Sequence, residues 1–342
     1  MKTRPQHPDS WKLLKFLQQA SEPQGYLNYC DYIRAALYHP QWGYYQGDRN
    51  RVGRHGESDY YTSQSLGKVF AEMVLEAARK LLNQCRMGSG PALEDFTFVE
   101  IGCEPGPNWF AKTAHPFGKM DHYGVNDPLH LSGPCVVFSN ELFDAQPFYR
   151  TVFMDGAWRE LGVAVSADGL DEIFLEDFSP AVAGFRPQLP STAVEGYQLD
   201  LPLPSVDLLH HIAQTRWSGL FIALDYGKSW EELIHQSPGG SGRAYSRHRQ
   251  KPNLLEEPGQ QDITCHICWT WLMEELERSG FKSIHLESQE AFFLKHAGKT
   301  IERIITACPG AFQRDRQTLK HLLHPAVMGQ QFQALWAYRP ES

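Results

Sequence analysis

Three short apolar runs set the strongest limit on how this chain can fold. They are "FTFVEIG" (Phe96 to Gly102), "CVVFS" (Cys135 to Ser139) and "GLFIALD" (Gly219 to Asp225). Continuous apolar runs of this length are typical of parallel strands that are buried on both faces. Segments with helical periodicity lie between and around them. This alternation predicts an α/β fold, with a mainly parallel sheet and helices on both of its faces.

The first 92 residues are predicted to form a helical region outside this sheet. Ser10 is expected to cap a short amphipathic helix, and a second helix should end at His39-Pro40, because proline cannot continue it. A long helix is expected from about Leu66 to Cys85, after a loop rich in glycine and arginine. We therefore expect residues 1–92 to be a helical N-terminal region with a lid loop, and residues 93–342 to be a Rossmann-like core.

Two insertions are expected within the core, near residues 178–205 and 228–262. The first contains many prolines. It follows a stretch, 149–174, that alternates as an antiparallel hairpin does and carries two Asp-Gly turns. After the second insertion, "TCHICWTWLMEELERSGF" predicts a helix from about Thr264 that Gly280 ends.

Composition disfavours several classes of protein. The chain has 32 Lys+Arg against 40 Asp+Glu, and its formal net charge of -8 disfavours nucleic-acid binding. The seven cysteines are odd in number and show no framework or zinc-like spacing, so reduced thiols and no metal are expected. No apolar run approaches the roughly 18 residues of a membrane span, and the N-terminus lacks an apolar signal segment. These features predict a bacterial cytoplasmic protein and leave its oligomeric state open.

The first apolar run leads into a turn related to one that class I methyltransferases use for S-adenosylmethionine. In "VEIGCEPG", Glu100, Gly102 and Gly106 fit the order apolar, acid, apolar, Gly-x-Gly-x-Gly. Such a turn lets the backbone approach a cofactor, and the following helix N-terminus favours negative groups. Glu104 stands where the middle glycine is expected; it would crowd the cofactor, or face its sulfonium or ammonium cation. A plain bend from strand to loop is the alternative.

Polar residues also follow the other two runs. Asn140, Glu141 and Asp144 in "SNELFDAQPF" come just after the second run, and Asp225 ends the third. Ligands of open α/β sheets bind at the carboxyl ends of the strands, so these residues are candidates for a site. The carboxylates could accept a proton from a methyl acceptor or bind a guanidinium group in bidentate fashion. The alternative is a helix that Ser139 or Asn140 caps.

Two loops could complete such a site. "SDYYTS" (Ser58 to Ser63) could fold over a pocket as a lid, while Thr62 and Ser63 could also simply cap the long helix. "RAYSRHRQK" (Arg243 to Lys251) is the one dense basic run. Its alternative is a solvated loop, with residues 262–264 capping the helix after it.

In this order, "SDYYTSQSLGKVFAEMV", "VEIGCEPG", "SNELFDAQPF", "LDYG" and "GRAYSRHR" resemble the MidA family of class I methyltransferases. That family includes the mitochondrial complex I assembly factor that methylates an arginine of a complex I subunit. The resemblance implies S-adenosylmethionine as cofactor and a protein substrate or assembly partner. It implies catalytic residues Glu141, Asp144 and Asp225; cofactor-binding residues Glu100, Gly102, Cys103, Gly106, Asn140, Thr62 and Ser63; and substrate-binding residues Tyr61, Arg243, Tyr245 and Arg247.

Two departures from the family pattern favour a second hypothesis. One is Glu104, and the other is the short stretch between Gly106 and Ser139. An acid that binds the cofactor ribose is expected about 20 residues past the turn, and only Asp121 and Asp127 are available. The adenosine half of the site is therefore expected to be reduced. The alternative function is a catalytically inactive, methyltransferase-like protein that binds a partner. A nicotinamide-dependent oxidoreductase would need three glycines and the ribose acid.

Overall fold

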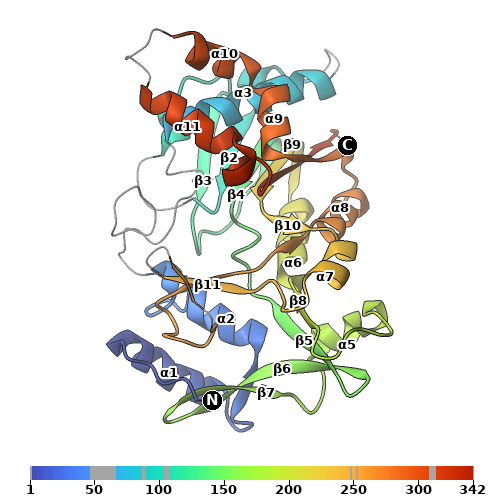
Figure 1. The fold of residues 1–342 in the computed structure, drawn as a ribbon. Helices are drawn as coiled ribbons and strands as arrows, with labels where there is room; N and C mark the ends of the chain where they lie inside the picture. Colours follow the sequence, from blue (N-terminus) through green and yellow to red (C-terminus); the bar gives the residue numbers. More distant parts are fainter. Residues whose placement is uncertain are drawn as a thin grey trace. The chain divides into compact units, whose positions relative to one another are not determined.

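The computed structural model describes most of the chain. The described residues are 2–46, 67–86, 90–103, 108–246, 249–251, 253–307 and 313–341. They form two compact units whose segments alternate along the chain (Figure 1). Unit 1 comprises Met1–Tyr60, Phe143–Asp207 and Lys228–Thr270, and unit 2 comprises Tyr61–Leu142, Leu208–Gly227 and Trp271–Ser342. The predicted division into residues 1–92 and 93–342 stays a prediction.

Unit 2 is built on a sheet of six strands in the order β15-β16-β9-β4-β2-β3. The pairs β9/β4, β4/β2 and β2/β3 are parallel, whereas β16 is antiparallel to both β9 and β15. The α/β class is thus confirmed, but a mainly parallel sheet is not, because the sheets are mixed. The strands are β2 (Thr97–Ile101), β3 (Lys119–Tyr123), β4 (Ser132–Asn140), β9 (Arg216–Asp225), β15 (Lys282–Ser288) and β16 (Gln333–Arg339).

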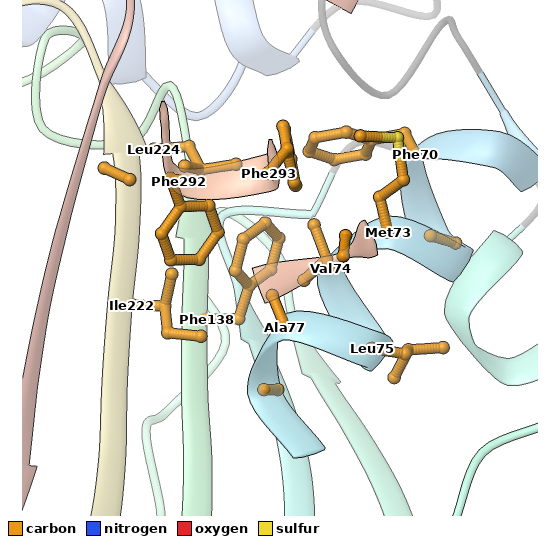
Figure 2. Close-up of a cluster of buried hydrophobic side chains, with 14 of the residues drawn as sticks. Phe70, Met73, Val74, Leu75, Ala77, Phe138, Ile222, Leu224, Phe292 and Phe293 are labelled. Carbon is orange, nitrogen blue, oxygen red and sulfur yellow. The ribbon is translucent and has the colours of Figure 1, made fainter. Parts of the chain in front are cut away.

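Two helices, α3 (Lys68–Cys85) and α9 (Gln289–His296), cover one face of this sheet (Figure 2). Phe138 on β4 and Ile222 on β9 point into this core, where Phe70 of α3 lies 6.1 Å from Phe138 between ring centroids. Successive side chains of a strand point to opposite faces of the sheet. A continuously apolar strand can therefore pack against apolar residues on both faces.

The opposite face of the sheet is also apolar. Phe221 of β9 lies 6.4 Å from Phe281, which follows α8 (Trp269–Arg278), and Phe281 also contacts Trp217. Apolar side chains therefore cover both faces of this sheet, and helices on both faces stay a prediction. The other helices of the unit are α4 (Trp109–Lys112), α6 (Leu203–Gln214, which begins in unit 1), α10 (Gly298–Thr306) and α11 (Gln313–Leu323), with short turns at Leu93–Asp95 and Pro325–Gly329.

Unit 1 contains an antiparallel sheet in the order β1-β6-β5-β8, with β7 also paired to β6. The helices α1 (Pro8–Ala20) and α2 (Tyr29–Tyr38) pack their apolar faces on it in a second core. A smaller antiparallel sheet has the order β12-β11-β13. The strands are β1 (Tyr26–Asn28), β5 (Tyr149–Met154), β6 (Ala157–Ser166), β7 (Gly169–Phe174), β8 (Gln198–Leu201), β11 (Arg243–Ser246), β12 (Arg249–Lys251) and β13 (Asp262–Thr264).

The hairpin predicted over 149–174 is confirmed. Asp155 and Gly156 both have positive φ, 54° and 76°, as the tight turn between β5 and β6 requires. The remaining short elements are the helices α5 (Pro180–Phe185) and α7 (Trp230–Gln236), the turns Tyr44–Gln46 and Arg186–Gln188, and the two-residue strands β10 (Gly227–Lys228) and β14 (Ile267–Cys268).

Three local predictions are wrong. Ser10 is buried inside α1, which His7 caps instead by accepting from the N–H of Asp9. The stretch from Thr264 is extended, and the helix begins only at Trp269, because Ile263 faces the core of unit 1 while its neighbours point the other way. Among the described residues, no helix begins at Ser139 or Asn140, so the capping alternative fails.

No helix among the described residues combines the length and the apolar character that crossing a bilayer requires.

Candidate functional site

The candidate site of unit 2 lies where the order of the sheet reverses. From β2 the chain passes to β3 on one side, and then returns to β4 on the other side. Open α/β sheets bind their ligands outside the carboxyl ends of strands at such a switch point. The predicted residues Glu100 and Gly102 lie at the end of β2, and Asn140 ends β4. The structure thus brings two of the predicted motifs to one edge of the sheet.

The backbone after β2 turns sharply at Gly102. Its φ is +81°, in the left-handed region, and its N–H donates to the carbonyl of Tyr123 at 2.8 Å. The N–H of Cys103 donates to the same carbonyl at 3.2 Å. A Cβ at position 102 would lie 2.8 Å from Cδ1 of Leu142. Glycine is therefore favoured at this position, because the left-handed φ strains other residues and a Cβ would displace the flexible end of Leu142.

Asn140 presents a buried acceptor at this edge. Its side-chain Nδ2 donates to Oε1 of Glu141 at 2.9 Å. Its Oδ1 is buried and has no hydrogen-bond partner in the part of the chain that the structure describes. Buried polar atoms are nearly always bonded, because an unbonded one costs about 1–3 kcal/mol. A bound molecule that offers an N–H or O–H group would satisfy this oxygen.

Glu141 has an uncommon backbone conformation. Its φ is +50°, and its N–H donates to the carbonyl of Leu224 on β9 at 2.9 Å, so this hydrogen bond continues the β4/β9 ladder by one residue. A non-glycine residue in the left-handed region costs roughly 1–2 kcal/mol. Strain of this kind is concentrated at functional sites, where the surrounding structure holds it. Glu100, the other predicted glutamate, is buried within β2.

Asp225 ends β9 and is completely buried. Its Oδ1 accepts from the N–H of Tyr226 at 2.9 Å. Directly opposite it, on β16, stands Gln333, whose Oε1 accepts from the N–H of Gly227 at 3.3 Å. Sequence analysis missed Gln333. Nothing local indicates it, because β16 reaches β9 from far along the chain.

The acid available near the cofactor turn is Asp127. Its Oδ2 accepts from the N–H of Gly124 at 2.7 Å, and a Cβ at Gly124 would lie 3.6 Å from the carbonyl oxygen of Cys103. Asp121 instead lies within β3 and pairs with Lys119 at 2.7 Å. The short stretch after the turn therefore does contain a second parallel strand, β3. It lacks a helix between β3 and β4.

Unit 1 carries the other predicted residues. Asp144 is buried, and its carbonyl accepts from the N–H of Cys265 at 3.1 Å. Tyr245 on β11 stands opposite Asp262 on β13. Burial raises the pKa of Tyr245, and the nearby carboxylates of Asp262 and Asp144 raise it further, against the Arg243 cation. Unit 1 therefore places Tyr245 opposite the buried Asp262 in the β11/β13 pair.

Of three further residues in this part of unit 1, Thr264 and His266 were candidates from the sequence, and Tyr45 was not. Tyr45 donates its hydroxyl to Oδ1 of Asp262 at 2.9 Å. Thr264, opposite Arg243, lies on the same face of its strand as Asp262. Burial, together with the cations Lys228 and Arg243, lowers the pKa of His266 to about 4, so its imidazole is neutral at pH 7. Residues 262–264 belong to a strand, so the alternative in which they cap a helix is wrong.

Six residues singled out from the sequence lie outside the described residues: Tyr61, Thr62, Ser63, Glu104, Gly106 and Arg247. Within the described ranges, no group of three or more His, Cys, Asp or Glu side chains could hold a metal ion.

Comparison with known proteins identifies the family. A family model described as "Putative S-adenosyl-L-methionine-dependent methyltransferase" matches residues 108–286, which is more than half of the chain. A relative from Drosophila melanogaster, "Protein arginine methyltransferase NDUFAF7 homolog, mitochondrial", is 25% identical over 395 aligned positions. The alignment covers 94% of this chain and 84% of that protein. That protein is mitochondrial by name, and the cytoplasmic location predicted for this chain is not confirmed.

Two crystal structures of proteins from Burkholderia thailandensis share the fold. One, bound to S-adenosyl-homocysteine, has a TM-score of 0.80 at 20% identity and covers 97% of this chain and 94% of that chain. The other, a native structure from the same superfamily, has a TM-score of 0.77 at 21% identity with the same coverage. At these identities the likeness establishes the fold.

The fold and the strand-end site define an α/β enzyme that binds a nucleotide-type cofactor at its switch point. The chain belongs to the family of S-adenosyl-L-methionine-dependent methyltransferases. S-adenosylmethionine is its methyl donor, and the resemblance to the MidA family is confirmed. The described residues fit this cofactor, because Asn140 offers a buried acceptor at the carboxyl end of β4, beside the glycine turn that follows β2.

Proposed function

We propose that this enzyme methylates the guanidinium group of an arginine in a protein. The printed name of the Drosophila relative, a protein arginine methyltransferase, supports this acceptor. The half-buried carboxylate of Glu141 and the buried carboxylates of Asp225 and Asp144 also support it, since the two oxygens of a carboxylate match the two N–H edges of a guanidinium group. The observation that carries the proposal is the unbonded Oδ1 of Asn140 at the switch point of unit 2, where Glu141 follows it directly in the chain.

The cofactor supplies an electrophilic methyl sulfonium, so the protein has mainly to bind and align. We assign cofactor binding to Glu100, Gly102, Cys103 and Asn140 at the strand ends, and ribose binding to Asp127. Glu141 and Asp225 accept the proton that the guanidinium must lose. Asp144, Arg243 and Tyr245 bind the acceptor chain. Of the other residues predicted from the sequence, we assign Gly106, Thr62 and Ser63 to cofactor binding. Tyr61 and Arg247 are assigned to binding of the acceptor chain.

Alignment is the main source of rate in this scheme. Holding a nucleophile in line with a reactive carbon can supply roughly 7–11 kcal/mol of the barrier reduction. The backbone of Glu141 is fixed on both sides, by its bond to Leu224 and by the end of β4. Its carboxylate also accepts a hydrogen bond from Asn140. This bond links Asn140, which is assigned to cofactor binding, with Glu141, which is assigned to accept the proton.

The alternative of an inactive binding protein is not favoured by the family match. It depended on Glu104 and on the short stretch between Gly106 and Ser139, and that stretch contains the parallel strand β3.

The test has two arms. Calorimetry with S-adenosylhomocysteine should give micromolar binding for the unmodified chain and about tenfold weaker binding for Asn140→Ala. Tritium transfer from labelled S-adenosylmethionine should then be measured on a peptide library with one central arginine. The same library with citrulline, the neutral isostere, is the blank. Label in both libraries, or in neither, would refute the arginine acceptor. No binding by either the unmodified chain or Glu104→Gly would refute the cofactor site.

A further inference from the structure

A loop of unit 1, residues 239–242, leads into β11 and is held by one buried carboxylate. Oδ2 of Asp200 accepts from the backbone N–H groups of Ser241 and Gly242, both at 2.6 Å. These are charge-assisted bonds, which are stronger than those between neutral groups. The loop begins with an isolated β-bridge between Gly239 and Gln198, and the Asp200 carboxylate binds its backbone further along, at Ser241 and Gly242.

Asp200 is itself fixed from the other side. Its Oδ1 accepts from Nε of Arg150 at 2.7 Å, and the side chains of the pair are 0% and 9% exposed. Arg150 also donates to Oε1 of Gln198 at 3.1 Å and lies 3.6 Å from Oε2 of Glu172. Separating the two partners of a buried pair would leave each charge uncompensated. The paired arrangement is therefore strongly preferred over others. The carboxylate is therefore a rigid anchor.

Two glycines allow the loop backbone to approach the Asp200 carboxylate closely. Gly240 has φ +70°, and a Cβ there would lie 2.5 Å from Oδ2 of Asp200. A Cβ at Gly242 would lie 2.8 Å from the Phe148 ring. Each glycine permits a backbone approach that a larger residue would prevent.

The anchored loop in turn orients the acceptor-binding side chains. Nη1 of Arg243 donates to the carbonyls of Gly242 at 2.7 Å and Gly240 at 3.2 Å. Tyr245 is two residues further along β11, on the same face as Arg243 and opposite Asp262. A shift of the loop would therefore move both side chains together.

We propose that Asp200 is a positioning residue for the methyl acceptor: by holding the N–H groups of Ser241 and Gly242, it sets where β11 presents Arg243 and Tyr245. This inference rests on the proposed function, in which those two side chains bind the acceptor. Asp200 touches neither cofactor nor acceptor in this scheme. Its loss should weaken acceptor binding and leave cofactor binding unchanged.

The first variant is Asp200→Asn, with Glu172→Gln as its matched control. An amide has one acceptor oxygen, so asparagine cannot serve both Arg150 and the loop. Glu172→Gln perturbs the same arginine without touching the loop. With the central-arginine library, Asp200→Asn should raise the acceptor KM about tenfold and change kcat less than about threefold. The S-adenosylhomocysteine affinity of both variants should stay that of the unmodified chain. Equal acceptor KM values for the two variants would overturn the proposal.

A second variant covers the case in which Asp200→Asn does not fold. Gly240→Ala places a Cβ 2.5 Å from Oδ2 of Asp200 and 3.3 Å from Nη2 of Arg150, so the loop and the carboxylate cannot both keep their positions. It should raise the acceptor KM in the same way. Gly184→Ala is its control, because a Cβ at position 184 meets nothing within 4 Å. An unchanged acceptor KM in a folded Gly240→Ala protein would overturn the proposal.

A spectroscopic arm separates failure of the positioning role from failure of the proposed function. 3-Fluorotyrosine at position 245 reports the surroundings of that ring by fluorine NMR and needs no acceptor. Its resonance should shift in Asp200→Asn and Gly240→Ala, and stay in place in Glu172→Gln. If it does so while the library is not methylated, the acceptor assignment fails and the anchor stands. If the library is methylated and the resonance stays in place in every variant, the anchor fails alone.

Discussion

Two aspartates, each fully buried near the end of a strand, show how differently the two units use the same group. Asp200 in unit 1 accepts from a guanidinium and from two backbone N–H groups that come from distant parts of the chain. Asp225 in unit 2 accepts from the N–H of the next residue, at the edge where parallel strands end. The first arrangement joins chain segments together. The second places a carboxylate where a ligand is expected to bind.

The comparison teaches that burial alone does not identify a catalytic acid. Both carboxylates would be selected by a search for buried charge. What distinguishes them is where their donors come from and which edge of a sheet they occupy. We therefore expect substitutions around Asp200 to reduce stability, and substitutions at the strand ends of unit 2 to reduce activity.

The largest expected effect is on stability, from Arg150→Met. This change removes the guanidinium that pairs with the buried Asp200, which should lower the free energy of unfolding by about 3–5 kcal/mol. Urea denaturation measures it. Arg159→Met is the control, because its pair with Asp155 is exposed and should contribute less than about 1 kcal/mol. Similar losses for the two variants would contradict the assigned difference between buried and exposed pairs.

Asp225→Asn should act mainly on the rate. Loss of a proton acceptor should lower methyl transfer by about 10²–10³-fold at saturating substrates. Initial rates with the central-arginine library measure this. Affinity for S-adenosylhomocysteine should change less than about threefold, which separates catalysis from binding. A rate within threefold of the unmodified enzyme would remove Asp225 from the proposed mechanism.

The pH dependence of stability tests the interior of unit 1. His266 has a pKa of about 4 in the folded protein, below its ordinary value near 6.5, so the unfolded chain binds the proton more readily. The contribution of neutral His266 to the free energy of unfolding is fully present above about pH 6.5. It should be lost as the pH falls towards 4, and the loss should reach up to about 3 kcal/mol. Urea titrations at several pH values, compared with His266→Gln, measure it. If the free energy of unfolding depends on pH equally in both proteins, the pKa of His266 is not lowered by folding.

The smallest effect is expected at the cofactor turn. Gly102→Ala introduces a Cβ at a φ of +81°, which costs roughly 1–2 kcal/mol, and moves the flexible end of Leu142. Affinity for S-adenosylhomocysteine should fall about tenfold, which calorimetry detects. Gly133→Ala is a matched control, since Gly133 has φ +67° and open space around it. If both variants bind alike, the turn after β2 does not approach the cofactor.

The sequence was most informative where one face of an element is uniformly apolar. The runs that became β2, β4 and β9 were identified because they are buried on both sides, and the switch-point residues followed from their ends. The edge strand β3, "KMDHY", carries no such run, and its polar residues are partly exposed. Because β3 was not recognised as a strand in the sequence, the part of the cofactor site that binds adenosine was expected to be reduced.

Long-range polar contacts could not be predicted in this way. Arg150 and Asp200 are 50 residues apart, and neither stands in a motif. Thr264 to Cys268 were assigned to a helix because apolar residues follow at helical spacing. The structure extends this stretch instead, because Ile263 packs in the core of unit 1 and Cys265 bonds back to Asp144. Tertiary packing overrides local preference there.

The position of β16 has a consequence for synthesis of the chain. This strand lies between β9 and β15, although both of those strands precede it in the sequence. While the polypeptide grows from the ribosome, β9 and β15 must therefore wait with unpaired backbone edges until residues 333–339 emerge. Open edges of this kind are templates for pairing with other chains. Nascent copies of this enzyme are thus most prone to associate with each other in the interval before β16 has been synthesised.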